Sequence, residues 1–139
     1  MQIEEIAREV VDSGYTVHTK LGPGLLESVY EVVLAKLLTG RGFSVERQKT
    51  VPIIFEGLRF DEGFRADLVV EGKLLVEIKS VENLIPVHGK QVLTYLRLLN
   101  LPLGLLMNFG AAIFRNGIKR IVNNHSDFES SSLRMHRPS

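Results

Sequence analysis

Two short apolar runs in the middle of the chain, joined by Glu71-Gly72-Lys73, constrain the fold more than any other segment. Residues 65–70 and 74–80 have the apolar and β-branched content of strands. A three-residue connection between them predicts an antiparallel hairpin in which Val70 pairs with Leu74. The rest of the fold must therefore build a sheet around this hairpin.

The predicted register sets two carboxylates against each other. Counting back along both strands places Asp67 directly opposite Glu77, and the Cβ atoms of facing residues lie about 5 Å apart. Two carboxylates at that distance repel each other unless one is protonated or a cation lies between them. Their oxygen atoms suit Mg²⁺ or Mn²⁺ better than zinc. A two-residue connection would instead turn Asp67 to the opposite face.

Lys79 adds an ammonium group to the same predicted face, because Glu77 and Lys79 lie two residues apart on one strand. The opposite face of the hairpin is predicted to be apolar along both strands, through Ala66, Leu68, Val70, Leu74, Val76 and Ile78. The backbone carbonyl of Ile78 is a further candidate metal ligand. The pattern indicates either a metal site or a solvated strand face with an ordinary Glu–Lys pair.

The composition is that of one globular domain, which we place at residues 1–123. Of the 139 residues, 45% are apolar and 24% are charged, which suffices to bury one core. The formal net charge of +1 shows no broad basic surface, although a local patch is enough for an enzyme to hold DNA. The absence of cysteine excludes disulfides, zinc–thiolate sites and cysteine nucleophiles. Without a membrane-spanning apolar run or a signal-peptide pattern, we expect a cytoplasmic protein.

The segments around the hairpin predict an α/β fold. The spacing of apolar residues and the positions of Gly and Pro predict helices at 3–18, 25–39 and about 86–100. Further strands are predicted at 43–55, 58–60 and 103–108. We expect a last hairpin within 113–122, around Asn116-Gly117, and a polar, loose tail over 124–139. The order α-α-β-β-β-β-α-β-β indicates a mixed β-sheet flanked by helices.

Polar side chains on two predicted helices are candidates for the same site. Glu27 lies in a first helical turn, where the helix dipole alone accounts for a carboxylate. Tyr30 follows three residues later, as a substrate contact or as a core tyrosine. His88, Gln91 and Tyr95 share one stripe of the later helix, and such a stripe needs hydrogen-bond partners if it is buried. His88 equally suits a helix cap.

These residues resemble the GxxExxY family. Gly24-Leu25-Leu26-Glu27-Ser28-Val29-Tyr30 fits the G-x-x-E-x-x-Y signature after which the family is named. The central hairpin and the later elements also resemble those of the family, in segments 64–73, 76–82, 86–96, 103–110 and 117–122. The likeness covers nearly all of residues 3–123. The family is placed in the PD-(D/E)XK nuclease superfamily, near its RecB-like branch, which implies a restriction-endonuclease-like core.

The resemblance implies a role for each acidic position and for the lysine. Asp67 and Glu77 correspond to the metal-binding acids of the superfamily motif. Lys79 corresponds to the lysine that positions or activates water, and Glu27 to the helical acid that completes the metal site. Ala66 stands where the superfamily motif has proline, which is usual in the GxxExxY family.

The resemblance also implies a substrate and its contacts. Gln91 and Tyr95 match the Q-x-x-x-Y pattern of the RecB-like branch, where they order the site and the substrate backbone. Arg65, Tyr30 and His88 are further candidates for substrate contact. We therefore expect a Mg²⁺-dependent nuclease, with Mn²⁺ able to substitute, that acts on nucleic acid and on DNA in particular.

Two other functions remain open at this point. One is a module that keeps the nuclease fold but only binds nucleic acid or a protein partner. The other is a structural role in which the sheet face forms an oligomer interface. A homodimer or a protein partner would also help so small a domain to hold a duplex, because specific protein–DNA interfaces bury about 1,000 Å² or more.

Overall fold

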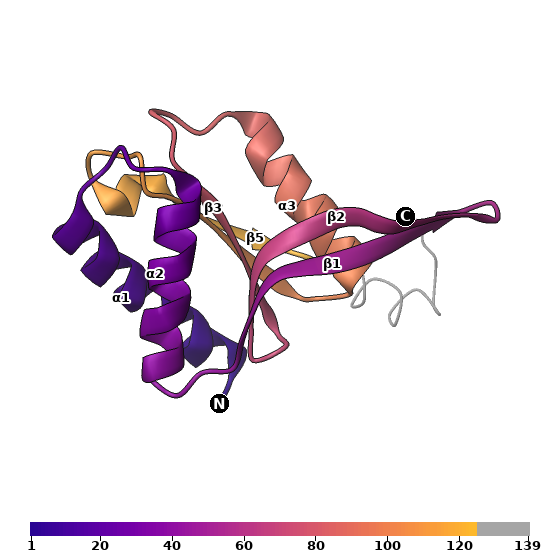
Figure 1. Cartoon of the computed structure of the whole chain (residues 1–139), viewed down its shortest axis with the longest axis horizontal. Coiled ribbons are helices and arrows are strands. Elements are labelled where there is room, and N and C mark those ends of the chain that lie inside the picture. Colours follow the sequence, from indigo (N-terminus) through magenta and orange to yellow (C-terminus); the bar gives the residue numbers. More distant parts are fainter. Residues whose placement is uncertain (125–139) are drawn as a thin grey trace.

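A five-stranded mixed sheet forms the centre of the protein, with helices on both faces (Figure 1). The computed structural model describes residues 1–124. The elements in chain order are α1 (Ile3–Leu21), α2 (Glu27–Gly40), β1 (Val45–Phe55), β2 (Leu58–Val70), β3 (Leu74–Lys79), α3 (Pro86–Leu99), β4 (Leu103–Asn108), the 3₁₀ helix η1 (Phe114–Gly117) and β5 (Ile118–Val122). The expected α/β fold, with a mixed sheet flanked by helices, is confirmed.

The strands lie side by side in sequence order. Only β3 and β4 are parallel, and α3 makes the crossover that a parallel pair requires. The predicted hairpin register is confirmed, because Val70 pairs with Leu74. Its short connection places Glu71 and Gly72 at positive φ, a conformation that suits glycine best.

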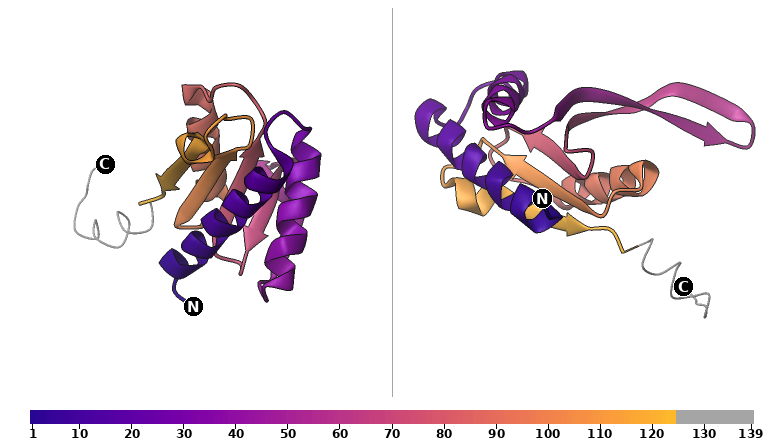
Figure 2. Two further views of the ribbon diagram at one scale, coloured as in Figure 1. Left: turned by 90° about the vertical axis from the view of Figure 1, so that its left-hand side faces the viewer. Right: turned by 90° about the horizontal axis from the view of Figure 1, so that it is seen from below.

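Two apolar layers, one on each face of the sheet, attach the helices (Figure 2). On one face α1 and α2 cover the strand residues Leu68, Val70, Leu74, Val76 and Ile78. On the other face α3 covers Ala66, Val69, Leu75 and Leu106. The first layer matches the predicted apolar face except at Ala66, which lies in the second layer. The regular alternation of β2 is therefore broken beside Asp67.

Two predicted features of the strands are wrong. The segments 58–60 and 65–70 are parts of one strand, β2, because β1 pairs with it from Phe55 to Val45 across a register shift. Residues 113–117 form no strand of a last hairpin; they include the 3₁₀ helix η1, and β5 pairs with β4 instead. The expected tail at 124–139 lies outside the described residues except for its first residue.

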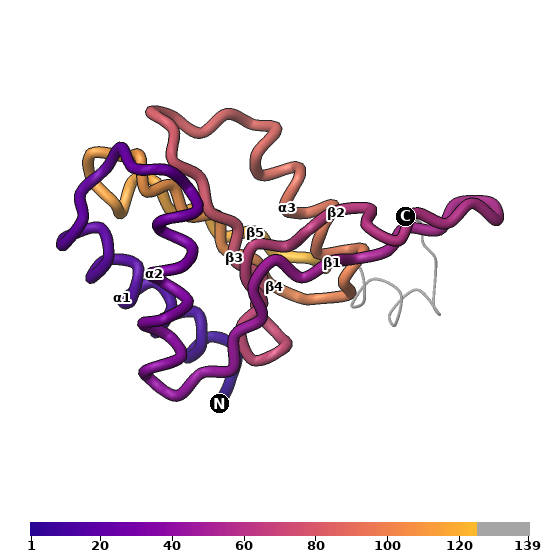
Figure 3. Tube along the Cα trace, viewed as in Figure 1, coloured from indigo at the N-terminus to yellow at the C-terminus, as the bar shows by residue number. Residues whose placement is uncertain are grey.

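The distal halves of β1 and β2 extend past the rest of the sheet as a two-stranded arm, residues 51–64 (Figures 1 and 3). Its register shifts by two residues on β2 between Val51 and Ile53. A Cβ atom at Gly63 would lie 2.3 Å from Ile53 Cγ1, so glycine lets the Ile53 side chain pack on the opposite strand there. The arm is thus attached to the sheet through an irregular segment.

Asn108, at the end of β4, ties the loops after β3 and β4 together. Its side chain is 1% exposed; Oδ1 accepts hydrogen bonds from Val81 N and Gly110 N, each at 3.0 Å, and Nδ2 donates to Val81 O at 2.9 Å.

Asn108→Ala leaves three buried backbone groups without partners and is expected to lower the free energy of unfolding by about 3 kcal/mol. Urea denaturation measures this, with Asn83→Ala, an exposed position in the same loop, as control. A loss below about 1 kcal/mol would contradict this role for the side chain.

Candidate metal centre

Asp67 and Glu77 lie where β2 and β3 separate. Backbone pairing between these strands extends from Val70–Leu74 to Leu68–Val76 and stops there. In place of a further ladder bond, Asp67 Oδ2 accepts a hydrogen bond from Ile78 N and Glu77 Oε2 accepts one from Asp67 N, both at 2.8 Å. The two carboxylates therefore face each other across the hairpin, as the register predicted.

The carboxylate pair is held in a poorly hydrated place. Glu77 is 7% exposed, and burial, reinforced by the charge of Asp67, raises its pKa to about 8. Burial likewise raises the pKa of Asp67, with Glu31 and Glu27 adding to the rise, although the N–H of Ile78 opposes it. Lys79 lies close enough to lower the pKa of both acids. The face is thus a buried acidic site with one ammonium group beside it, not the solvated strand face that the sequence allowed as an alternative.

The hairpin face that carries these acids is polar only at the end where β2 and β3 separate, beyond the Leu68–Val76 pair. Val69 and Leu75 share it and are buried beneath α3. Val92 and Leu96 of α3 pack in the same layer. The apolar contact with α3 therefore closes one end of the site, and Asp67 and Lys79 are partly exposed at the other end.

Glu27 reaches the site from the start of α2. Its Oε2 accepts a hydrogen bond from Ser80 N at 3.3 Å, and Ser80 Oγ donates to Leu25 O at 2.5 Å. These two bonds fix the end of β3 to the start of α2. Glu27 thus lies beside the acid pair without contacting it directly. Its hydrogen-bond partner, Ser80, is the residue that follows Lys79 at the end of β3.

Glu31 and Gln48 belong to the site and were not predicted. Glu31 is 6% exposed and binds Arg47 at 3.1 Å, while Gln48 Nε2 donates to Glu31 Oε1 at 2.6 Å and, more weakly, to Asp67 Oδ1 at 3.4 Å. The spacing of four residues between Glu27 and Glu31 on one helix was a signal for the second acid. No comparable signal existed for Gln48.

Tyr95 is the α3 residue that the structure brings to the acids. Its ring stacks on Phe64 at a centroid distance of 4.0 Å, and the charges of Glu77 and Asp67 add to burial in raising the pKa of its phenol. Gln91 lies one turn earlier but is exposed, and its side chain makes no hydrogen bond within residues 1–124. Backbone N–H groups hold the carboxylates in this structure, and the role expected for Gln91 stays a prediction.

His88 caps α3. Its ring atom Nδ1 accepts a hydrogen bond from Ile85 N at 3.1 Å, and its backbone N–H donates to Ile85 O at 3.0 Å. The cap that the sequence allowed as an alternative is thus present. In the neutral ring this bond leaves the proton on Nε2, which is the atom that remains available to a ligand.

Tyr30 is a core residue. It has no exposed surface, its hydroxyl donates to Gly22 O at 2.5 Å and accepts from Leu25 N at 3.0 Å, and its ring stacks on Phe109. The expectation of substrate contact for Tyr30 is therefore wrong. It instead shapes the Gly22–Leu25 turn that leads into Glu27. Arg65 is exposed on β2 and pairs with Glu62 at 2.9 Å.

The donor set fits a divalent cation. Glu77 is buried, and its Oε1 accepts no hydrogen bond within residues 1–124, so this carboxylate has an acceptor atom without a protein donor. The N–H of Ile78 points to β2, and in an extended strand the carbonyl of the same residue points the same way. Across the described chain no three acidic or imidazole side chains converge to hold a metal. Mg²⁺ needs only one or two carboxylates besides water and substrate oxygens.

A mixed sheet that presents two acids and a lysine where its strands separate is the arrangement of a restriction-endonuclease-like nuclease core. A family model described as the PD-(D/E)XK nuclease superfamily matches residues 4–121. The chain therefore belongs to the PD-(D/E)XK nuclease superfamily. No curated protein matches the chain. None of the helices in residues 1–124 combines the length and apolar character that crossing a membrane requires.

Proposed function

We propose that this protein is a Mg²⁺-dependent nuclease that hydrolyses phosphodiester bonds in DNA. The observation that carries the proposal is the pair Asp67 and Glu77, held face to face by backbone N–H groups, with Lys79 beside them. Glu77 is buried, and its Oε1 accepts no hydrogen bond within residues 1–124. Such a pair is unfavourable without a cation and becomes favourable with one.

The ligands of the cation would be the two carboxylates and the Ile78 carbonyl, with Glu27 contributing through water. Mg²⁺ or Mn²⁺ held there supplies Lewis-acid polarisation of the scissile phosphate and makes a nearby water more acidic. The ammonium group of Lys79 donates hydrogen bonds to the attacking water and offsets the negative charge that develops on the phosphate. Gln48 of β1, which bonds to Glu31 of α2, also donates a weaker hydrogen bond to Asp67.

The substrate strand would follow the open side of the site. Tyr95 and, one turn away, Gln91 present polar groups along α3, and His88 adds Nε2 at the start of that helix. Arg65 supplies an exposed guanidinium on β2. We propose that these four side chains contact the sugar–phosphate backbone, which supplies most protein–DNA hydrogen bonds.

The finer family assignment is part of this proposal. Gly24, Glu27 and Tyr30 stand at the signature positions of the GxxExxY family. The hydrogen bonds of Tyr30 to the turn that precedes Glu27 support this assignment. Gln91 and Tyr95 support the RecB-like branch through their shared position on α3. A cytoplasmic location stays a prediction.

A nicking assay on supercoiled and single-stranded DNA tests the proposal. Cleavage is expected with Mg²⁺ or Mn²⁺ and is expected to stop with a chelator. Lys79→Ala is expected to lower the cleavage rate about 100-fold without weakening metal binding, because the lysine acts on water and phosphate rather than on the cation. Lys90→Ala, an exposed lysine on α3, is the matched control. DNA binding without cleavage in the wild type would instead support a module that only binds.

A further inference from the structure

The tip of the arm carries four exposed apolar side chains, most of them on one face. Ile54 is 64% exposed, Phe55 63%, Leu58 61% and Phe60 55%. Phe55 pairs with Leu58, and Phe60 pairs with Ile53, so these side chains share one face while Ile54 points to the other. An exposed apolar strip at the tip of a narrow hairpin removes more surface from water when it enters a groove than when it lies on a flat surface.

The charges of the arm favour a protein over nucleic acid as the occupant. Glu56 stands at the apex of the turn and makes no ion pair within residues 1–124. Arg59, the one basic residue within 51–64, is already paired with Asp61 at 2.7 Å. The arm therefore has a net negative charge at its tip, whereas binding to a phosphate backbone requires a surplus of positive charge.

A groove of complementary character lies between α1 and α2. It has a volume of about 500 Å³ and is lined by apolar and basic side chains, among them Val17, Lys20, Leu21, Val33, Lys36 and Leu37. Lys36 also lines an adjoining hollow with Val32 and Ala35. Within residues 1–124 neither Lys20 nor Lys36 makes an ion pair. The groove thus offers apolar walls and unpaired positive charges to an apolar ribbon with an acidic apex.

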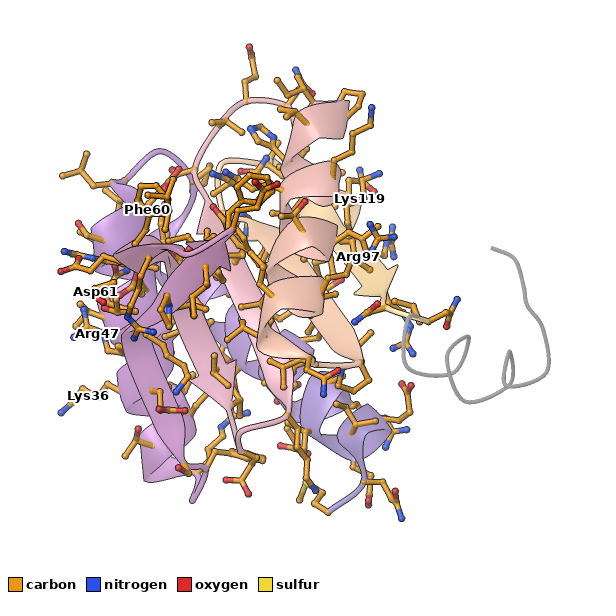
Figure 4. The ribbon with its side chains drawn as sticks, turned by 90° about the vertical axis from the view of Figure 1, so that its right-hand side faces the viewer. Lys36, Arg47, Phe60, Asp61, Arg97 and Lys119 are labelled. Atoms are coloured by element: carbon orange, nitrogen blue, oxygen red, sulfur yellow. The ribbon has the colours of Figure 1, made fainter. Side chains whose placement is uncertain are left out.

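The α2 helix has more apolar surface than its own chain covers. Its outer side leaves Val29 37% and Val32 46% exposed, although a helix that is apolar on most sides is normally buried. Lys36 projects outward from the body, on the opposite side from Arg97 and Lys119 (Figure 4). This side of α2 is therefore suited to contact with another molecule.

The arm cannot fill the groove of its own chain, because the tip and the α1–α2 pair lie at opposite ends of the molecule (Figures 1 and 2). We propose that the arm tip of one copy enters the α1–α2 groove of a second copy, which returns the same contact. A reciprocal exchange closes with two-fold symmetry and uses the contact twice. Doubling matters because stable interfaces bury about 1,200–2,000 Å² in total, more than one hairpin tip supplies.

Cross-linking tests this arrangement directly, since the native chain has no cysteine. Glu56→Cys in one preparation and Lys36→Cys in another are mixed and oxidised. The expected product is a disulfide-linked pair of one chain of each kind. Lys90→Cys mixed with Glu56→Cys is the control and should give no such product. Equal yields from both mixtures, or none from the first, would overturn the proposed contact.

Charge reversal provides a second, non-covalent test by sedimentation velocity. The wild type is expected to sediment as a dimer, and Glu56→Lys or Lys36→Glu alone should raise the dimer dissociation constant about tenfold. The variant that carries both substitutions should recover the wild-type constant, a rescue that occurs only if the two side chains meet. A monomer at every concentration, or a dimer indifferent to both changes, would overturn the inference. The readout is molecular mass, so it is independent of whether the chain cleaves DNA.

Discussion

Asp67→Asn and Glu77→Gln are each expected to lower the metal-dependent cleavage rate about 1,000-fold or more. Both changes keep the shape of the side chain and one carbonyl oxygen. That oxygen still accepts the hydrogen bond from Ile78 N in the first case and from Asp67 N in the second. What is lost is the negative charge that a cation requires, so the fold should survive while the activity does not.

Initial nicking rates, with calorimetric titration of Mg²⁺, measure this prediction. The heat of metal binding should disappear in both variants together with cleavage. Glu9→Gln on α1 is the matched control, because it removes a carboxylate from the opposite layer of the molecule and should leave both quantities unchanged. Cleavage that persists at the wild-type rate in Asp67→Asn and Glu77→Gln would exclude the proposed site.

The free energy of unfolding of the metal-free protein is expected to fall by about 2–4 kcal/mol as the pH rises from 5 to 8, through Glu77 alone. The pKa of Glu77 is about 8 in the folded protein against an ordinary value of 4.5, so the folded state binds more protons throughout this window. The stabilisation is complete below pH 4.5 and is lost as the pH passes through 8. Asp67 changes in the same direction, and the two acids titrate as a pair.

Urea denaturation at several pH values measures the slope, and Glu77→Gln isolates the contribution of Glu77, because other groups also titrate. The variant should show a flatter dependence and greater stability than the wild type at pH 8. Mg²⁺ should also stabilise the wild type, but more at pH 8 than at pH 5, since its ligands must be deprotonated. Equal slopes for the wild type and Glu77→Gln would show that Glu77 is ionised in the folded state across this range.

The carboxylate pair shows how far local signals reach. A connection of three residues closes a hairpin in few ways, and strand alternation then fixes which side chains face each other. Asp67 and Glu77 were therefore predictable without any tertiary information. The arm shows the limit of the same reasoning. Strand partners counted from the turn at Glu56 would have been wrong by two residues at Gln48. The reason is that β2 has two extra residues opposite the register shift between Val51 and Ile53.

The helical candidates depended on burial, which spacing does not determine. Tyr30 and Glu27 lie three residues apart, yet one is sealed in the core and the other reaches Ser80 at the end of β3. Gln91 and Tyr95 lie one turn apart, yet only Tyr95 packs against Phe64 beside the acids. Helical periodicity identifies a shared stripe, but the depth of each residue depends on how the helix is tilted against the sheet.

The sequence by itself determined the hairpin register and most of the helix and strand positions. It also determined that Asp67 faces Glu77 and that Lys79 shares the face of Glu77. Turns and strand periodicity act over a few residues, so these features need no tertiary information. Only the tertiary structure decided that α2 and α3 enclose these acids, that Glu31 and Gln48 join them and that backbone N–H groups hold them. Desolvation of the acids comes from segments far apart in the chain and raises the pKa of Glu77 and Asp67, whereas the hydrogen bonds from the backbone oppose that rise.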